Sequence, residues 1–149
     1  MKFGVQQRGY VLVAIAVSFM AVSCTSSKVS QCANTIKVVN QAVIDTKNIS
    51  DSGTKGDLQT IGKLVEIFDR SARDLEAVNV DNEKLKTYKG QFLTMYKGAT
   101  DIGKQLIVSI QEKKSTKVNE GLRKYTSIVS PEQDLVTGLN QYCQQPEKG

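Results

Sequence analysis

The sequence predicts an all-α protein, an up-down-up-down four-helix bundle that follows a removable signal peptide. Apolar residues recur at steps of three and four along four successive segments, the spacing typical of one buried face on each helix. No segment shows the sustained alternation of apolar and polar residues that predicts a half-buried strand. Short polar connections separate the four segments, and four helices joined by short loops favour an antiparallel bundle.

The first predicted element is an export signal over residues 1–23. Lys2 and Arg8 precede the apolar stretch 11–22, which would span about 18 Å as a helix. A bilayer core requires roughly 20 apolar residues. The stretch is therefore predicted to be a signal peptide that is cleaved, rather than a membrane span.

The residues at the end of this stretch, Ala21-Val22-Ser23-Cys24, resemble the lipobox of bacterial lipoproteins, with Ala21 where that family usually has Leu. The resemblance implies that Cys24 is acylated and anchors an exported chain to a membrane, facing the periplasm or the cell exterior. Residues 24–31 would form the lipidated cysteine and a short tether, and residues 32–149 the bundle domain. The same tripeptide also fits ordinary secretion, which would leave Cys24 as a free thiol.

Two helices are predicted before residue 80. Ser30 is the expected N-cap of the first helix and Asp57 is that of the second. A polar loop at 50–56 connects the two helices. The apolar stripe of the first helix is Cys32, Ile36, Val39 and Val43. The stripe of the second is Leu58, Ile61, Val65, Phe68, Ala72 and Leu75, a heptad seam.

Two further helices are predicted after a tight connection at Asn79-Val80, with Asp81 as the cap and a turn at 113–116 between them. The third stripe is Leu85, Tyr88, Phe92, Met95, Ala99, Ile102, Leu106, Ser109 and Ile110. The fourth is Val118, Leu122, Tyr125, Val129, Val136, Leu139 and Cys143. Ser130-Pro131-Glu132-Gln133 has the pattern of a helix start with a capping box, which predicts a kink or restart near Ser130-Pro131.

Cys32 and Cys143 are predicted to form a disulfide. One opens the first helix and the other closes the fourth, so four antiparallel passes bring both to the same end of the bundle. A cysteine pair in an exported chain is most often bridged, and two buried free thiols are the alternative. A bridge over so long a loop should stabilise the fold by roughly 4–5 kcal/mol.

The composition argues against an enzyme and against a nucleic-acid-binding protein. The chain has no histidine, the commonest general base and metal ligand, and no G-x-S-x-G motif. Its net charge of +5 falls to +3 once Lys2 and Arg8 leave with the signal, which is low for a nucleic-acid binder. We therefore expect no catalytic residue, no metal, no cofactor and no nucleic-acid partner.

The plan of the whole chain resembles small bacterial lipoproteins that consist of an acylated cysteine, a short tether and a four-helix bundle. The predicted anchor, the rigid bundle and the missing catalytic chemistry favour a non-catalytic interaction module, which docks on or stabilises an unidentified envelope or membrane protein. The lipidated extrinsic Q-type subunit of cyanobacterial photosystem II has the same plan and is a minor alternative. The candidate partner surface is the lysine cluster Lys113, Lys114 and Lys117.

A second functional hypothesis is a carrier that binds a small apolar molecule between its helices. Tyr88, Phe92 and Tyr96 follow one another at steps of four on the third predicted helix. They are interpreted as core aromatics or, in the alternative, as a strip that binds an apolar ligand or a partner helix.

Overall fold

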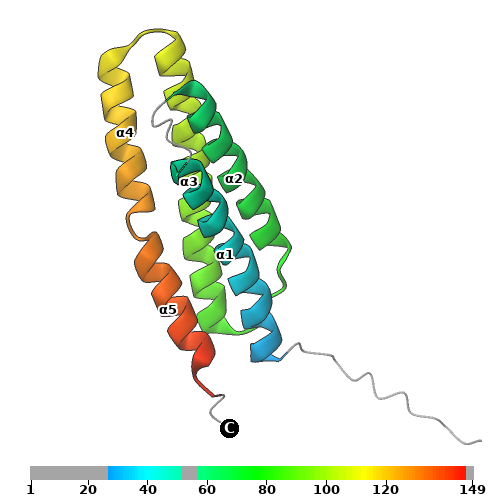
Figure 1. The fold of residues 1–149 in the computed structure, drawn as a ribbon. Helices are drawn as coiled ribbons and strands as arrows, with labels where there is room; N and C mark the ends of the chain where they lie inside the picture. Colours follow the sequence, from blue (N-terminus) through cyan, green and yellow to red (C-terminus); the bar gives the residue numbers. More distant parts are fainter. Residues whose placement is uncertain (1–26, 52–56, 147–149) are drawn as a thin grey trace, which may run out of the picture.

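The computed structural model describes residues 27–51 and 57–146, and these residues form helices and the connections between them. The all-α class is therefore confirmed for this part of the chain. The helices lie side by side along one axis in Figure 1, and none of those described is both long and apolar enough to cross a membrane. They are α1 (Lys28–Asp51), α2 (Leu58–Ala77), α3 (Glu83–Gln111), α4 (Ser115–Val129) and α5 (Glu132–Gln144).

Helix α1 begins at Lys28, so residues 28–31, which the sequence assigned to the tether, belong to the helix. The predicted cap at Ser30 is wrong, because the Ser27 hydroxyl accepts the Ser30 N–H at 3.3 Å. Lys28 is buried at this end, where its Nζ donates to the Gln145 carbonyl at 2.7 Å. The N-terminus of α1 thus includes polar residues that the sequence placed in the tether, because Lys28 is held by this contact at the end of α5.

The caps of α2 and α3 show one prediction confirmed and one corrected. Asp57 caps α2, since its Oδ1 accepts the Thr60 N–H at 2.6 Å. The predicted cap of α3 at Asp81 is wrong, because Asn82 accepts the Leu85 N–H at 3.0 Å. The neighbouring Asp81 uses its backbone N–H instead, in a hydrogen bond to Gln31.

The fourth pass is broken as the proline predicted, with α4 ending at Val129 and α5 beginning at Glu132. The predicted capping box is wrong, because no side chain caps α5 and Pro131 holds the N-cap position. The Ser130 hydroxyl donates to the Ser127 carbonyl at 3.0 Å. This bond takes the place of the backbone donor that proline lacks at position 131.

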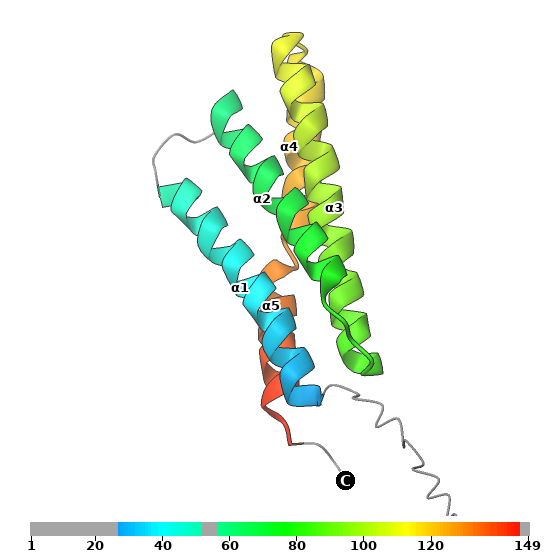
Figure 2. The same ribbon diagram turned by 90° about the vertical axis from the view of Figure 1, so that its right-hand side faces the viewer.

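The hydrophobic core follows α3, which packs on α2, α4 and α5. Helix α1 packs mainly on α2 and α5, and the Arg70 guanidinium joins it to α2 through Asp45 at 2.5 Å. Figure 2 shows that the helix pair α1–α2 diverges from the pair α3–α4, and that the pairs are furthest apart at the end that holds the α3–α4 turn. The largest fully buried side chains are Tyr96, Phe68, Phe92, Leu75, Leu85, Leu139, Val39 and Thr35.

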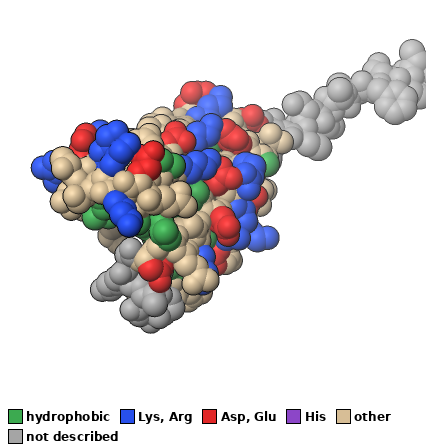
Figure 3. Space-filling view, turned by 90° about the horizontal axis from the view of Figure 1, so that it is seen from above, with side chains coloured by type: hydrophobic (Ala, Val, Ile, Leu, Met, Phe, Trp, Pro, Cys, Tyr) green, Lys and Arg blue, Asp and Glu red, His purple; other side chains and the backbone are tan. Residues whose placement is uncertain are grey.

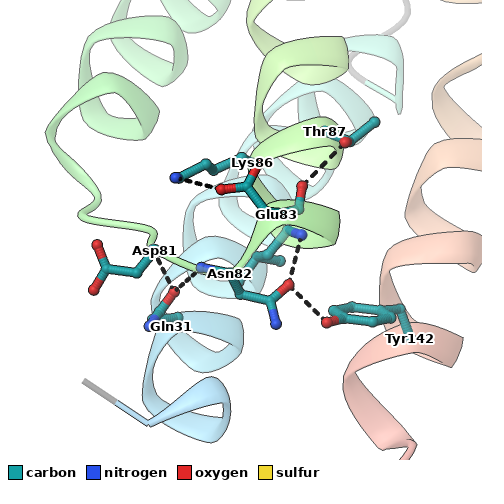
Figure 4. Close-up of polar contacts among 8 residues, drawn as sticks. Gln31, Asp81, Asn82, Glu83, Lys86, Thr87 and Tyr142 are labelled. Carbon is teal, nitrogen blue, oxygen red and sulfur yellow. Dashed lines mark hydrogen bonds and ion pairs between the residues drawn. The ribbon is translucent and has the colours of Figure 1, made fainter. Parts of the chain in front are cut away.

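The end of the molecule that holds the Cys32–Cys143 bridge is called here the disulfide end. The disulfide is formed as predicted, with an S–S distance of 2.10 Å and Cα atoms 5.7 Å apart. Gln31 Oε1 accepts the N–H groups of Asp81 and Asn82 at 2.7 and 3.2 Å. Asn82 Oδ1 accepts the Tyr142 hydroxyl at 2.7 Å, so α1, the α2–α3 connection and α5 are tied together (Figure 4).

Candidate functional site

The α3–α4 turn, residues 112–114, projects furthest among the described residues at the end opposite the disulfide. Figures 1 and 2 both show the tops of α3 and α4 extending beyond the end of α1 and the start of α2. The turn begins one residue and ends two residues earlier than predicted, because Ser115 and Thr116 already belong to α4. We call this part of the molecule the hairpin end.

Lys113 closes α3 in a backbone conformation that normally favours glycine. Its φ is 54°, and its N–H bonds to the Ile110 carbonyl at 3.0 Å while the Lys114 N–H bonds to the Ser109 carbonyl at 2.9 Å. This is the Schellman arrangement at a helix C-terminus, whose left-handed residue is usually Gly. A lysine in this exposed position carries a conformational cost that glycine would avoid.

Basic side chains concentrate on this hairpin. Residues 104–124 contain six basic and two acidic residues. Lys114 pairs with Glu112 at 2.7 Å, and Lys113 and Lys117 are exposed without an ion pair to any described residue. The view onto the hairpin end shows lysine and arginine side chains among acidic and apolar areas (Figure 3).

Helix α4 is only lightly covered by the rest of the molecule. None of its residues is buried, and Leu122 on its apolar stripe is 46% exposed. The stripe predicted from the sequence therefore lies against α3, and α2 covers it only in part, where the Phe68 ring lies 6.3 Å from that of Tyr125. This leaves apolar surface on both flanks of the α3–α4 contact.

One flank forms a groove, here called the α4–α5 groove, with a volume of about 910 Å³. It follows the break between α4 and α5 and is bounded on the other side by α3. Lys117, Lys124 and Ile128 share one face of α4 because they are spaced by seven and four residues. The groove thus continues from apolar residues toward the lysines of the hairpin end. Its lining residues include Gly90, Met95, Ile102, Lys124, Ile128, Pro131 and Leu135.

The predicted aromatic strip lies in the core. Phe92 and Tyr96 are 0% exposed, and the Tyr96 ring stacks on Phe68 with centroids 5.6 Å apart. Tyr88 lies against Tyr142, with ring centroids 6.1 Å apart. These three residues do not line the α4–α5 groove, nor a smaller cavity between α2, α3 and α4 that is described below. The structure therefore supports their interpretation as core aromatics.

A buried polar group beneath the α4–α5 break was not expected from the sequence. Glu132 has a carboxylate oxygen shielded from solvent and without a hydrogen-bond partner, and burial raises the pKa of this carboxyl. The Tyr96 hydroxyl is likewise buried and unpartnered; burial, and then the Glu132 charge, raise its pKa above the usual range. The same two causes raise the pKa of Tyr125 to about 12. The sequence pattern concealed this group because Glu132 fits the first turn of a helix.

The remaining predicted site residues fall into two groups. Cys24 and the signal 1–23 lie outside the described residues, so acylation stays a prediction. The three lysines of the proposed partner surface are brought together at the hairpin end, with Lys113 and Lys114 in the turn and Lys117 in the first turn of α4. In the described part, no cluster of three or more His, Cys, Asp or Glu side chains could hold a metal ion.

Comparison with protein-family models, with curated proteins and with solved structures gave no match. The function of the chain is therefore inferred from its residues and their arrangement.

Proposed function

We propose that this chain is a lipid-anchored envelope protein whose up-down-up-down bundle presents the hairpin end as a non-catalytic docking element for a membrane or envelope protein. The observation that carries the proposal is the combination at one tip of a projecting turn, a lysine in a left-handed conformation and an excess of basic over acidic side chains. The adjoining α4–α5 groove adds apolar surface to the same face of α4.

The anchor and the tip lie at opposite ends of the bundle under this proposal. An acylated Cys24 precedes Ser27 by three residues, which span at most about 10 Å. The disulfide end would therefore sit next to the lipid surface. Helix α3, with 29 residues, is about 43 Å long and would carry the hairpin end away from the membrane.

The partner that fits this surface is acidic and carries an apolar side chain or helix. Basic side chains steer an acidic partner and set its orientation, whereas most of the affinity comes from apolar groups that become desolvated. The lysines would meet carboxylates, and Ile128, Pro131 and Leu135 would contact the apolar part. Such binding should weaken as salt concentration rises.

Site-specific photo-cross-linking in whole cells tests the docking surface. A photoreactive residue at Lys117 or Gln91 should give one defined adduct, and the same residue at Asn40 or Lys47 on the exposed side of α1 should not. Charge reversal of Lys113, Lys114 and Lys117 to Glu should remove the adduct, whereas reversal of Lys37 and Lys47 should leave it. Equal adducts from both faces, or none from α4, would contradict the proposal.

Metabolic labelling with palmitate tests the anchor separately. The intact chain should incorporate label and sediment with membranes, and the Cys24→Ala chain should do neither. A Cys32→Ser, Cys143→Ser double variant is the matched control, since it loses two cysteines but keeps Cys24. Labelling that persists in Cys24→Ala would overturn the proposed acylation site.

A further inference from the structure

A cavity of about 220 Å³ lies between α2, α3 and α4 in the half of the molecule nearer the hairpin end. Its walls are hydrocarbon except for the side chains of Thr60 and Tyr125. The α4 side chains that line it, among them Leu122 and Tyr125, are distinct from those that line the α4–α5 groove, so α4 separates the two hollows. The apolar walls include Ile61, Val65, Leu106, Ile110, Val118 and Leu122.

The backbone geometry keeps this cavity open. A Cβ atom on Gly103 would lie 2.4 Å from Val65 of α2, and one on Gly121 would lie 2.7 Å from Leu106 of α3. At these points the helix pairs α2–α3 and α3–α4 are already at close approach, so neither can move inward to fill the space. The Tyr125 ring reaches Phe68 of α2, with centroids 6.3 Å apart, and closes the cavity on the core side.

We propose that this cavity is a binding site for a small uncharged hydrocarbon group, such as a substituted benzene ring or an alkyl chain of six to eight carbons. An apolar cavity of about 150 Å³ remains dry and binds benzene, and this one is larger. Water would need two to four polar partners to settle there, and only Thr60 and Tyr125 carry hydroxyl groups in the lining. A charged ligand is disfavoured because no ionisable side chain other than the tyrosine lines the walls.

The hydrocarbon could come from a free small molecule or from the end of a lipid acyl chain. Leu122 lines the cavity and is 46% exposed, which marks the side on which the cavity reaches the surface. A free molecule would lie within the cavity, whereas an acyl chain would pass out beside Leu122. Both sources would place the same kind of hydrocarbon group in the cavity. They differ in how the affinity for a linear alcohol should depend on the length of its alkyl chain.

The test adds toluene and the linear alcohols from 1-hexanol to 1-dodecanol to the full chain, and binding is followed by melting curves and titration calorimetry. Toluene at ten times its dissociation constant should raise the Tm by about 5 °C. Affinity should rise about fourfold with each methylene until the cavity is full. A decline beyond about eight carbons would indicate a free small molecule, and a plateau maintained to dodecanol would indicate an acyl chain.

The variant Val118→Phe fills the cavity, and Val108→Phe is its control because Val108 is 51% exposed and absent from the lining. Val118→Phe should weaken toluene binding at least tenfold, and Val108→Phe should leave it unchanged. If Val118→Phe fails to fold, Leu106→Ala serves instead, because it enlarges the cavity and should shift the preferred alcohol to a longer chain. No thermal shift with any probe, or equal binding by both valine variants, would overturn the proposal.

Discussion

Glu132 shows how a single residue can satisfy a local rule and conflict with the fold around it. An acidic residue in the first turn of α5 is favourable for the helix dipole. The same residue points a carboxylate oxygen into the interior, where it finds no partner and where its charge disfavours the ionisation of Tyr96 and Tyr125. The sequence revealed the first property because it is local. The second property could not be predicted because it depends on Tyr96 of α3 and Tyr125 of α4, which are distant in the sequence.

We expect Glu132→Gln to raise the free energy of unfolding at pH 7 by up to about 1 kcal/mol, a small gain because part of the side chain still meets water. The folded state raises the pKa of Glu132, so the fold favours its protonated form. The protonated Glu132 therefore contributes to the stability of the folded state in full below its unfolded pKa of about 4.3. This contribution is lost as the pH rises through the higher pKa of the folded state.

Urea denaturation of wild type and Glu132→Gln from pH 4 to pH 8 measures this contribution. The two stabilities should converge at acidic pH and diverge as the pH rises. The exposed Glu66→Gln is the matched control and should run parallel to wild type. A constant difference at all pH values would show that Glu132 is not a buried titrating group.

Lys113 provides a second test at the same scale. We expect Lys113→Gly to stabilise the protein by about 0.5–1 kcal/mol, because Gly adopts the left-handed conformation without the penalty that a Cβ brings. Lys117→Gly, inside α4, should instead cost up to about 1 kcal/mol. Urea midpoints report both, and a loss of stability in Lys113→Gly would contradict the assigned turn conformation.

At the scale of elements, the apolar stripes located every helix, and the errors lie at the ends. Stripes extend over many residues, so a misplaced residue does not change their period. A cap depends on one side chain, and adjacent polar residues such as Asp81 and Asn82 compete for the position. Asn82 prevails because its Oδ1 serves both Leu85 and the Tyr142 hydroxyl of α5, a contact that depends on the tertiary fold.

Replacing that residue should therefore be costly. We expect Asn82→Ala to destabilise the protein by about 1–2 kcal/mol, since it removes a helix cap and leaves the Tyr142 hydroxyl without its acceptor. Asp81→Ala should be close to neutral, because Asp81 bonds to Gln31 through its backbone N–H, which alanine retains. Asn82→Asp keeps the acceptor oxygen and should recover most of the loss in thermal melts. Equal losses at positions 81 and 82 would rule out the cap at Asn82.

At the scale of the whole molecule, the sequence predicted four equivalent helices around one core, and the structure is less regular. Helix α1 leans toward α2 and leaves the stripe of α4 partly uncovered. Periodicity shows which face of a helix is apolar but does not show how closely two helices approach. Here glycines set those distances, for example where Ile128 lies over Gly98, so neither the groove nor the cavity could be predicted from the stripes.

The disulfide is a large contribution to stability that can be removed without changing any other side chain. It closes a loop with a sequence separation of 111 residues, so its loss should lower the free energy of unfolding by about 4–5 kcal/mol. Reductant should lower the Tm by about 15–25 °C. The Cys32→Ser, Cys143→Ser variant should melt at this lower temperature with or without reductant. A wild-type melting curve that ignores reductant would contradict a stabilising bridge.

The same bridge turns the chain between Cys32 and Cys143 into a covalent ring. A protease that cuts the ring once, for example at the exposed α3–α4 turn, opens it without releasing either piece. Both pieces would remain joined to the N-terminal segment that contains Cys24. Damage at the projecting tip would therefore leave a nicked protein whose two pieces stay together, and only a second cut or a reduced disulfide would free a fragment.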